Sequence, residues 1–119
     1  MESGKDALPL TEAFYYILVA LYGGPSHGYG IMQDVEQMSR GRVTIGAGTL
    51  YTALNTLAKK QLIASAGLDR GADARRKMYA ITDHGREALH GELDRLELLL
   101  QNGRHAISRK GSVEHEHTK

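Results

Sequence analysis

The sequence predicts a mainly α-helical fold with a small β-hairpin. Apolar residues recur every three or four positions in four segments, which is the spacing of helices that bury one face. Between the third and the fourth of these segments the apolar period changes to two, which is typical of strands. The chain of 119 residues is long enough for one domain with a single hydrophobic core.

The first two helices are separated by a breaker, Gly-Gly-Pro, at positions 23–25. Thr11 is the predicted N-cap of the first helix, which we expect to end at about Tyr22. Ser26 is the predicted N-cap of the second helix, which is expected over residues 27–38. The apolar residues of the first helix lie on almost all of its sides. This indicates burial on more than one side, and in a small chain a second subunit is a plausible cover.

A third helix and two strands are expected in the middle of the chain. The helix is expected over residues 47–61, where three leucines share one face: Leu50, Leu54 and Leu57. Apolar and polar residues then alternate over 62–68 and again over 77–81, which predicts two strands. The polar segment 69–75 between them makes the pair a β-hairpin with a long, charged tip.

The last helix is expected to begin after Thr82, its predicted N-cap, and to continue to Arg104 or beyond. Four of its leucines are spaced by four, three and four residues, as in the seam of a coiled coil: Leu89, Leu93, Leu96 and Leu100. These leucines either pack on their own domain or form a seam between two chains. We interpret them as an intermolecular seam, because little core remains to be covered after the hairpin. The tail 109–119 has no apolar pattern and is predicted to be disordered.

Charge is distributed unevenly, although the net charge is only +1. The stretch from Arg40 to Ala80 holds eight of the 15 Lys and Arg residues but only two of the 14 Asp and Glu residues. A basic middle between acidic ends attracts a polyanion to one surface. The alternative is an ordinary solvated surface on which basic residues cluster by chance.

Several classes of protein are disfavoured by the composition. The chain has no cysteine, which excludes disulfides, thiolate metal sites and a cysteine nucleophile, and which fits a reducing cytoplasm. The N-terminus lacks the basic and apolar pattern of a secretory signal. The longest apolar run, 13–22, is half of the ~20 residues that a membrane span needs. We therefore expect a soluble cytoplasmic protein that does not enter a membrane.

Neither a catalytic site nor a metal site is predicted. The six histidines do not fall at a recognisable ligand spacing. Ser26 stands beside His27, but no nucleophile motif and no ordering acid accompany them. We therefore expect no enzymatic activity, no metal and no cofactor.

Three short helices followed by a charged hairpin is the order of a winged helix-turn-helix, whose third helix enters the major groove of DNA. No Asp or Glu occurs between positions 47 and 61, as expected of a surface that meets phosphates. The predicted contacts on this helix are Thr49, Tyr51, Thr52, Asn55, Lys59 and Lys60. Those on the hairpin, or wing, are Arg70, Arg75, Arg76 and Lys77. The alternatives are merely solvated surfaces, or a winged-helix module that binds proteins and not DNA.

The sequence resembles the PadR family of transcriptional regulators from about residue 8 to residue 89. Each matching piece is weak alone, but the set is specific in its order and spacing. The matching residues are Leu10-Thr11-Glu12, His27-Gly28-Tyr29, Gly48-Thr49-Leu50-Tyr51 with Leu54 and Leu57, Leu62-Ile63, Arg76-Lys77-Met78-Tyr79, Ile81-Thr82 and Gly85. Two positions depart from the family pattern. Thr52 stands where proline often follows the tyrosine, and 73–75 (Asp-Ala-Arg) stands where the family often has Gly-Arg-Pro.

The resemblance implies a homodimeric DNA-binding regulator, usually a repressor, with a C-terminal dimerisation helix of the small-subfamily type. The expected organisation is a winged helix-turn-helix over 8–82, the dimerisation helix over 83–108 and the tail 109–119. A dimer would bind a palindromic double-stranded DNA operator. A small apolar or aromatic effector is expected near the dimer interface. The residues expected at that interface are Phe14, Tyr15, Leu89, Leu93, Leu96 and Leu100.

Overall fold

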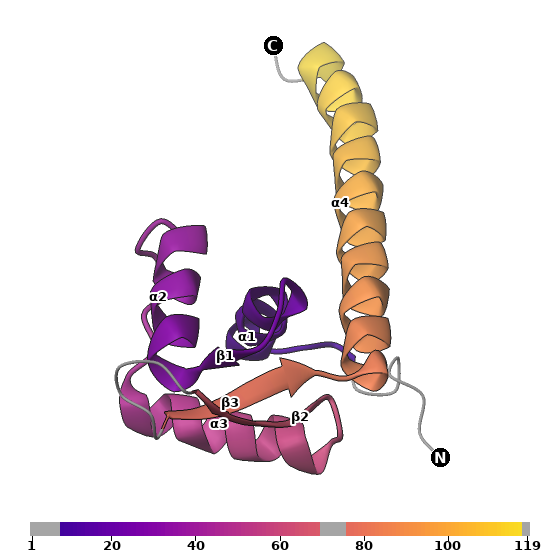
Figure 1. Cartoon of the computed structure of the whole chain (residues 1–119). Helices are drawn as coiled ribbons and strands as arrows, with labels where there is room; N and C mark the ends of the chain where they lie inside the picture. Colours follow the sequence, from indigo (N-terminus) through magenta and orange to yellow (C-terminus); the bar gives the residue numbers. More distant parts are fainter. Residues whose placement is uncertain (1–7, 70–75, 118–119) are drawn as a thin grey trace.

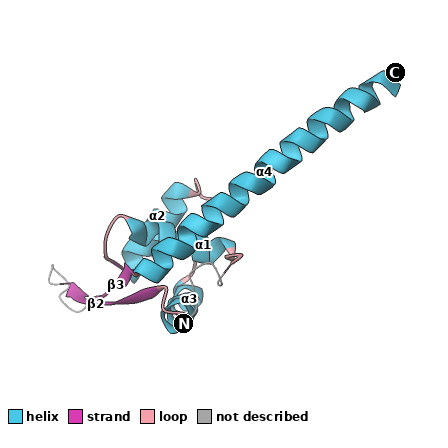
Figure 2. Ribbon diagram, turned by 90° about the vertical axis from the view of Figure 1, so that its right-hand side faces the viewer, coloured by secondary structure: helices cyan, strands magenta, loops and turns pink. Residues whose placement is uncertain are grey.

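A three-stranded antiparallel sheet, three short helices and one long helix make up the structure, a computed structural model that describes residues 8–69 and 76–117 (Figure 1). The long helix projects away from the winged domain, so the molecule measures 66 × 36 × 22 Å (Figure 2). The elements in chain order are α1 (Glu12–Tyr22), β1 (Ser26–His27), α2 (Gly28–Met38), α3 (Ala47–Lys59), β2 (Ile63–Asp69), β3 (Arg76–Ile81) and α4 (Asp83–His117).

The first helix begins and ends as predicted, whereas the second has a different cap. The Thr11 hydroxyl accepts a hydrogen bond from the backbone N–H of Phe14 at 3.1 Å, which confirms it as the N-cap of α1. The prediction of Ser26 as the cap of α2 is wrong. The imidazole of His27 takes that role and accepts from the backbone N–H of Gly30 at 3.0 Å. Ser26 is instead paired with β3, which removes it from the helix.

The predicted hairpin is present and carries a third strand. The strand order is β1-β3-β2, with Ser26 opposite Tyr79 and Ile63 opposite Ile81. The register of β2 shifts between Ser65 and Leu68, where Gly67 adopts a φ of +89°. The sequence did not predict β1, because two residues are too few to show an alternating pattern.

The third helix ends two residues before the predicted boundary. Gln61 adopts a left-handed φ of 64°, and the N–H of Leu62 donates to the carbonyl oxygen of Leu57 at 2.9 Å. This is the bond of a Schellman-type helix end, which satisfies a terminal carbonyl and turns the chain towards β2.

The last helix is longer than predicted. The Thr82 hydroxyl accepts from the N–H of Gly85 at 3.0 Å, which confirms Thr82 as its N-cap. The helix then continues to His117, so the predicted boundary at 108 is too early, and 109–117 is helical where we predicted disorder. This segment has no proline, and a single glycine, Gly111, costs a helix only about 1 kcal/mol relative to alanine.

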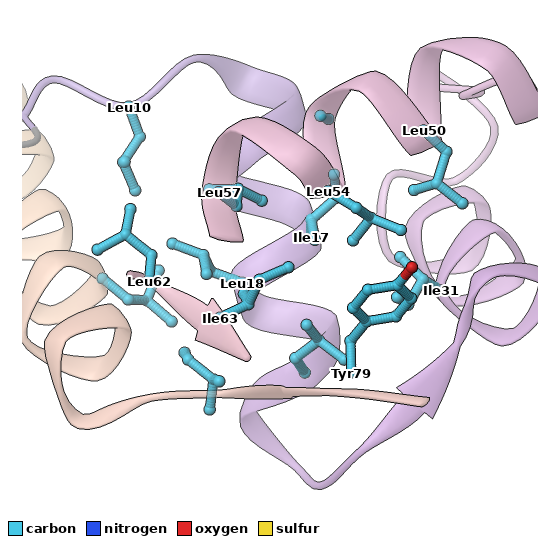
Figure 3. Close-up of a cluster of buried hydrophobic side chains, with 14 of the residues drawn as sticks. Leu10, Ile17, Leu18, Ile31, Leu50, Leu54, Leu57, Leu62, Ile63 and Tyr79 are labelled. Atoms are coloured by element: carbon cyan, nitrogen blue, oxygen red, sulfur yellow. The ribbon is translucent and has the colours of Figure 1, made fainter. Parts of the chain in front are cut away.

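The core lies between α1 and the elements around it (Figure 3). Ile17, Leu18 and Leu21 of α1 are fully buried against apolar side chains of α2, α3 and the sheet. Because α1 contacts α2, α3, α4 and β3, its all-round apolar character is largely explained within one chain. A second subunit is therefore not needed to cover most of this helix.

Glu92 of α4 is bonded both within its own helix and to the segment before α1. Glu92, only 2% exposed, accepts two hydrogen bonds from Arg95 at 2.8 and 2.7 Å. The hydrogen bonds from Arg95 hold the pKa of the Glu92 carboxyl below its usual value, against the opposing effect of burial, and the backbone of Leu10 adds a further hydrogen bond. The carboxylate therefore ties the segment before α1 to α4.

Candidate nucleic-acid interface

The polar face of α3 is exposed at the end of the molecule opposite to the free end of α4 (Figure 1). Its apolar face is buried in the core through Leu50, Ala53, Leu54 and Leu57. Every residue predicted to touch DNA from this helix and its C-cap is exposed: Thr49, Tyr51, Thr52, Asn55, Lys59 and Lys60. Four of them, at 51, 52, 55 and 59, follow helical spacing and form one stripe. The helix thus presents donors to solvent and no carboxylate.

Two threonines of α3 use their hydroxyl protons within the helix. Thr52 donates to the carbonyl oxygen of Gly48 at 3.1 Å, and Thr56 donates to that of Thr52 at 3.1 Å. The hydroxyl oxygen of Thr52 remains an acceptor, and its methyl group remains an apolar contact for a base. Thr52, which stands where the family often has proline, therefore offers DNA an acceptor and a methyl group, because its hydroxyl proton is used within the helix.

A groove of about 560 Å³ joins α3 to the wing and to the start of α2. Its walls are formed by His27, Gly28, Tyr29, Tyr51, Arg76 and Lys77. Gly28 is packed closely there: a Cβ atom at this position would lie 3.0 Å from the Tyr51 hydroxyl and 3.3 Å from Leu50 Cδ2, so these side chains would have to shift. The glycine therefore lets the Tyr51 ring lie across the start of α2.

The wing residues Arg76 and Lys77 stand at the first two positions of β3. The Lys77 ammonium lies 5.5 Å from the centroid of the Tyr79 ring. Burial, and then the nearby Tyr51 hydroxyl, raise the pKa of Tyr79, so this phenol stays neutral beneath the lysine. The other two predicted wing contacts, Arg70 and Arg75, lie outside the described residues.

The predicted interface residues of α4 separate into two groups. Leu89 is only 4% exposed and belongs to the domain's own core, so it is not available for a seam between chains. Leu93, Leu96 and Leu100 are 40–54% exposed on the projecting part of α4. Ile107, which the prediction missed, follows Leu100 by seven residues and is 71% exposed. The exposed stripe is therefore longer than the sequence prediction.

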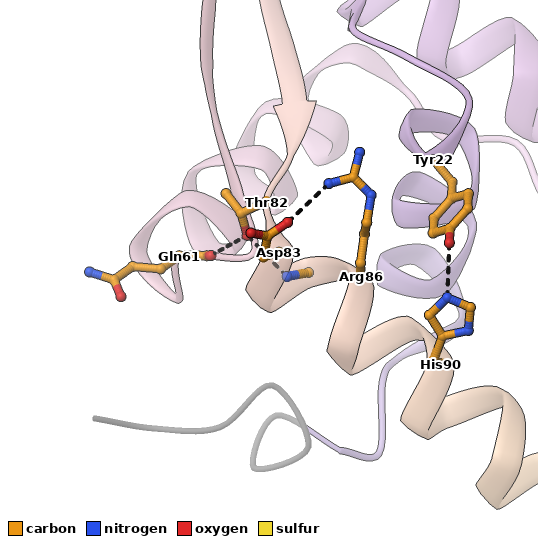
Figure 4. A network of polar contacts seen from close by, with 7 residues as sticks. Tyr22, Gln61, Thr82, Asp83, Arg86 and His90 are labelled. Carbon is orange, nitrogen blue, oxygen red and sulfur yellow. Dashed lines mark hydrogen bonds and ion pairs between the residues drawn. The ribbon is translucent and has the colours of Figure 1, made fainter.

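The two predicted interface residues of α1 lie in different places. Tyr15 lines a pocket of about 340 Å³ between α1 and α4, together with Leu89, Leu93 and others. Phe14 lines a separate groove of about 640 Å³ along α3. At the rim of the first pocket, Tyr22 is hydrogen-bonded to His90 at 2.9 Å (Figure 4), and the Arg86 guanidinium lies 5.7 Å from the Tyr22 ring centroid. The structure thus groups Tyr15 with α4 and Phe14 with α3.

Sequence reasoning also missed the place of His27 beside the wing. The residue was interpreted only as a helix-start position, and β1 is too short for the sequence to have placed it next to β3. Within the described part of the chain there is no cluster of three or more His, Asp or Glu side chains suited to a metal ion. None of the helices described has the length and apolar character to cross a membrane.

Several known proteins are similar to this chain in sequence or in fold. A 37.1 kDa protein in transposon Tn4556 of Streptomyces fradiae is 40% identical over 82 residues, which are 69% of this chain and 22% of that protein. The chain therefore spans about a fifth of the length of this relative. The structure of a transcriptional regulator from Clostridium thermocellum has a TM-score of 0.66 and 27% identity, covering 76% of this chain and 88% of that one.

A structure of Bacillus subtilis PadR in complex with operator DNA is also similar. It has a TM-score of 0.59 and 28% identity, and the match covers 67% of this chain and 45% of that one. The model of the transcriptional regulator PadR-like family matches residues 17–91, which include the second half of α1, all of α2, α3 and the sheet, and the start of α4. The chain therefore belongs to the PadR-like family of transcriptional regulators.

Proposed function

We propose that the protein is a homodimeric repressor that binds a palindromic double-stranded DNA operator through α3 and the wing. The observation that supports this most directly is the exposed polar face of α3, which offers donors and no carboxylate. Lysine, threonine and tyrosine side chains of this kind are suited to contact phosphates. Asn55 carries an amide that is suited to bind adenine in bidentate fashion. The similar Bacillus subtilis PadR was solved with operator DNA, which supports the same function here.

The projecting part of α4 is the proposed dimer contact. Its exposed apolar stripe continues, at helical spacing, the face that packs on the domain itself through Ala88, Leu89 and Glu92. A second copy of α4 would bury the stripe and fix the two copies of α3 at a set distance. Recognition helices of a dimer meet half-sites about one helical turn, roughly 34–36 Å, apart.

Salt dependence tests the proposed DNA binding. We expect fragments from the gene's own upstream region to bind, with an affinity that falls by about 10³–10⁵ between 50 and 200 mM salt for six to ten phosphate contacts. Arg76→Ala should weaken binding to all sequences and lower the salt slope by about one. Arg109→Ala removes the same charge from an exposed position of α4 on the side away from Leu100 and Ile107, and it should leave the affinity unchanged. Fluorescence anisotropy measures both, and a flat salt response would contradict DNA binding.

An effector is proposed for the pocket between α1 and α4. Tyr15, Val19 and Leu93 give this pocket apolar walls, and the bonded Tyr22 and His90 give it a polar rim. A small aromatic molecule with one polar group fits that chemistry. Leu93 belongs both to this pocket and to the exposed stripe of α4. A molecule bound in the pocket would therefore change the relative position of the two subunits in the proposed dimer. Release of the operator fragment by phenolic compounds in the anisotropy assay tests this, and unchanged anisotropy at saturating compound would refute it.

A further inference from the structure

His27 makes a close contact through each of its ring nitrogens at the junction of α2 and the wing. Nδ1 accepts the backbone N–H of Gly30 at 3.0 Å and so caps α2. Nε2 lies 3.0 Å from Nη1 of Arg76, at the start of β3. The side chain thus connects the start of a helix with the first residue of a wing strand 49 positions away.

The cap determines which ring nitrogen carries the proton. A neutral imidazole has one N–H donor and one acceptor nitrogen. Because Nδ1 accepts from Gly30, Nε2 is the nitrogen that bears hydrogen. The guanidinium of Arg76 is always a donor. Nε2–H and the guanidinium therefore meet as two N–H donors that do not bond to each other, and an oxygen anion that accepts from both makes this arrangement favourable.

The surroundings of this pair also suit an anion. The groove that His27 and Arg76 line is completed by Gly28, Tyr29, Tyr51 and Lys77, and none of these residues is acidic. The groove opens beside the exposed stripe of α3 that Tyr51 begins. A DNA strand that passes from α3 to the wing would cross this point.

We propose that His27 is a DNA-contacting residue, whose Nε2–H joins the Arg76 guanidinium in holding one phosphate of the DNA backbone. The proposal rests on the proposed DNA binding of the chain and names a contact that its charged residues alone do not indicate. The imidazole has two tasks, which can be separated by substitution: Nδ1 stabilises α2, and Nε2 contacts the phosphate.

Two amide substitutions separate these tasks. In His27→Asn the side-chain oxygen replaces Nδ1 as an N-cap acceptor, but the side chain is too short to reach the place of Nε2. In His27→Gln the amide nitrogen reaches the place of Nε2, but glutamine is a poor N-cap. We expect His27→Asn to keep its melting temperature and to lose about tenfold in DNA affinity. His27→Gln should melt at a lower temperature but recover most of the affinity at 10 °C, where it stays folded.

The opposite pattern would assign the effect to capping, and an equal loss of affinity in both variants would leave Nε2 without a separate role; either result would overturn the proposal. A double-mutant cycle adds a second criterion. If His27 and Arg76 hold the same phosphate, Arg76→Ala should cost less in the His27→Asn background than in the wild type, and strict additivity would contradict a shared contact.

The tautomer is measured without DNA. Nitrogen-15 correlation spectra of the free protein at pH 8 should show His27 protonated at Nε2, and a proton on Nδ1 would overturn the proposal. Failure of the inference is distinguishable from failure of the proposed function. If the wild type binds DNA and Arg76→Ala weakens it, but His27→Asn does not, only the inference is wrong. If the wild type shows no salt-dependent DNA binding, the proposed function itself is wrong.

Discussion

Replacing Gly85 with alanine is expected to destabilise the fold by about 3 kcal/mol or more. Gly85 lies in the first turn of α4, where a Cβ atom would run into the carbonyl oxygen of Leu62 and lie 2.7 Å from Cγ1 of Ile81. The Leu62 carbonyl is not free to move, because it accepts the backbone N–H of Thr82 at 3.1 Å. Urea unfolding, followed by circular dichroism, measures the change.

The expected loss is large because this junction holds three elements together. The Thr82 hydroxyl caps α4 through Gly85 and also donates to the carbonyl of Gln61 at 2.7 Å (Figure 4). An added methyl group would separate the start of β2 from the start of α4 and break these bonds together. The steric contact is with backbone, which cannot adopt another rotamer as a side chain can.

Gly48→Ala is the matched control for this substitution. Gly48 also lies in the first turn of a helix, α3, but nothing surrounds the position that a Cβ atom would take. Alanine there should stabilise the protein by roughly 0.5–1 kcal/mol, since glycine is the weaker helix former. If Gly85→Ala were as harmless as Gly48→Ala, the close contact of the first turn of α4 with the Leu62 backbone would be wrong.

Most of the fold follows from local patterns in the sequence. The caps at Thr11 and Thr82 and the alternation in β2 and β3 are signals within a few residues, and the structure confirms each of them. The sequence prediction is wrong where a contact between residues far apart in the chain determines the local structure. Ser26 has the chemistry of an N-cap, but pairing with Tyr79 draws it into the sheet, and His27 caps the helix instead.

The candidate site also has a part that local sequence patterns predict and a part that only tertiary packing determines. Helical spacing places Tyr51, Asn55 and Lys59 on one exposed stripe, because that depends on α3 alone. The groove beside it joins α2, α3 and β3, so its composition is visible only in three dimensions. Leu89 is a case in which helical spacing alone gives the wrong prediction. Its spacing matches that of Leu93 and Leu96, but tertiary packing places Leu89 in the core and leaves the others exposed.

Leu93→Glu is expected to convert a dimer into monomers. Leu93 is 41% exposed and begins the stripe that continues through Leu96, Leu100 and Ile107. Burying a carboxylate without a partner in the middle of an apolar seam is costly, whereas a monomer leaves it in water. Sedimentation velocity should show one species near the chain mass of 13.1 kDa where the wild type shows twice that mass. Helical content should be unchanged.

The loss of the dimer should also weaken operator binding. Two linked α3 helices bind two half-sites with an avidity that exceeds single-site binding by about 10²–10⁴. Leu93→Glu should therefore reduce affinity for a palindromic fragment by about a hundredfold or more, and have a much smaller effect on a single half-site. The two affinities, measured by anisotropy at the same salt concentration, separate a lost dimer from a damaged DNA surface.

Leu98→Glu is the matched control on the same helix. Leu98 is 57% exposed, but helical spacing places it on the side of α4 away from Leu93, Leu96 and Leu100. The substitution introduces the same charge without entering the proposed seam, so this variant should remain dimeric and bind the palindrome as the wild type does. Persistent dimers of Leu93→Glu would exclude this stripe as the contact. Monomers of Leu98→Glu alone would move the interface to the opposite side of α4.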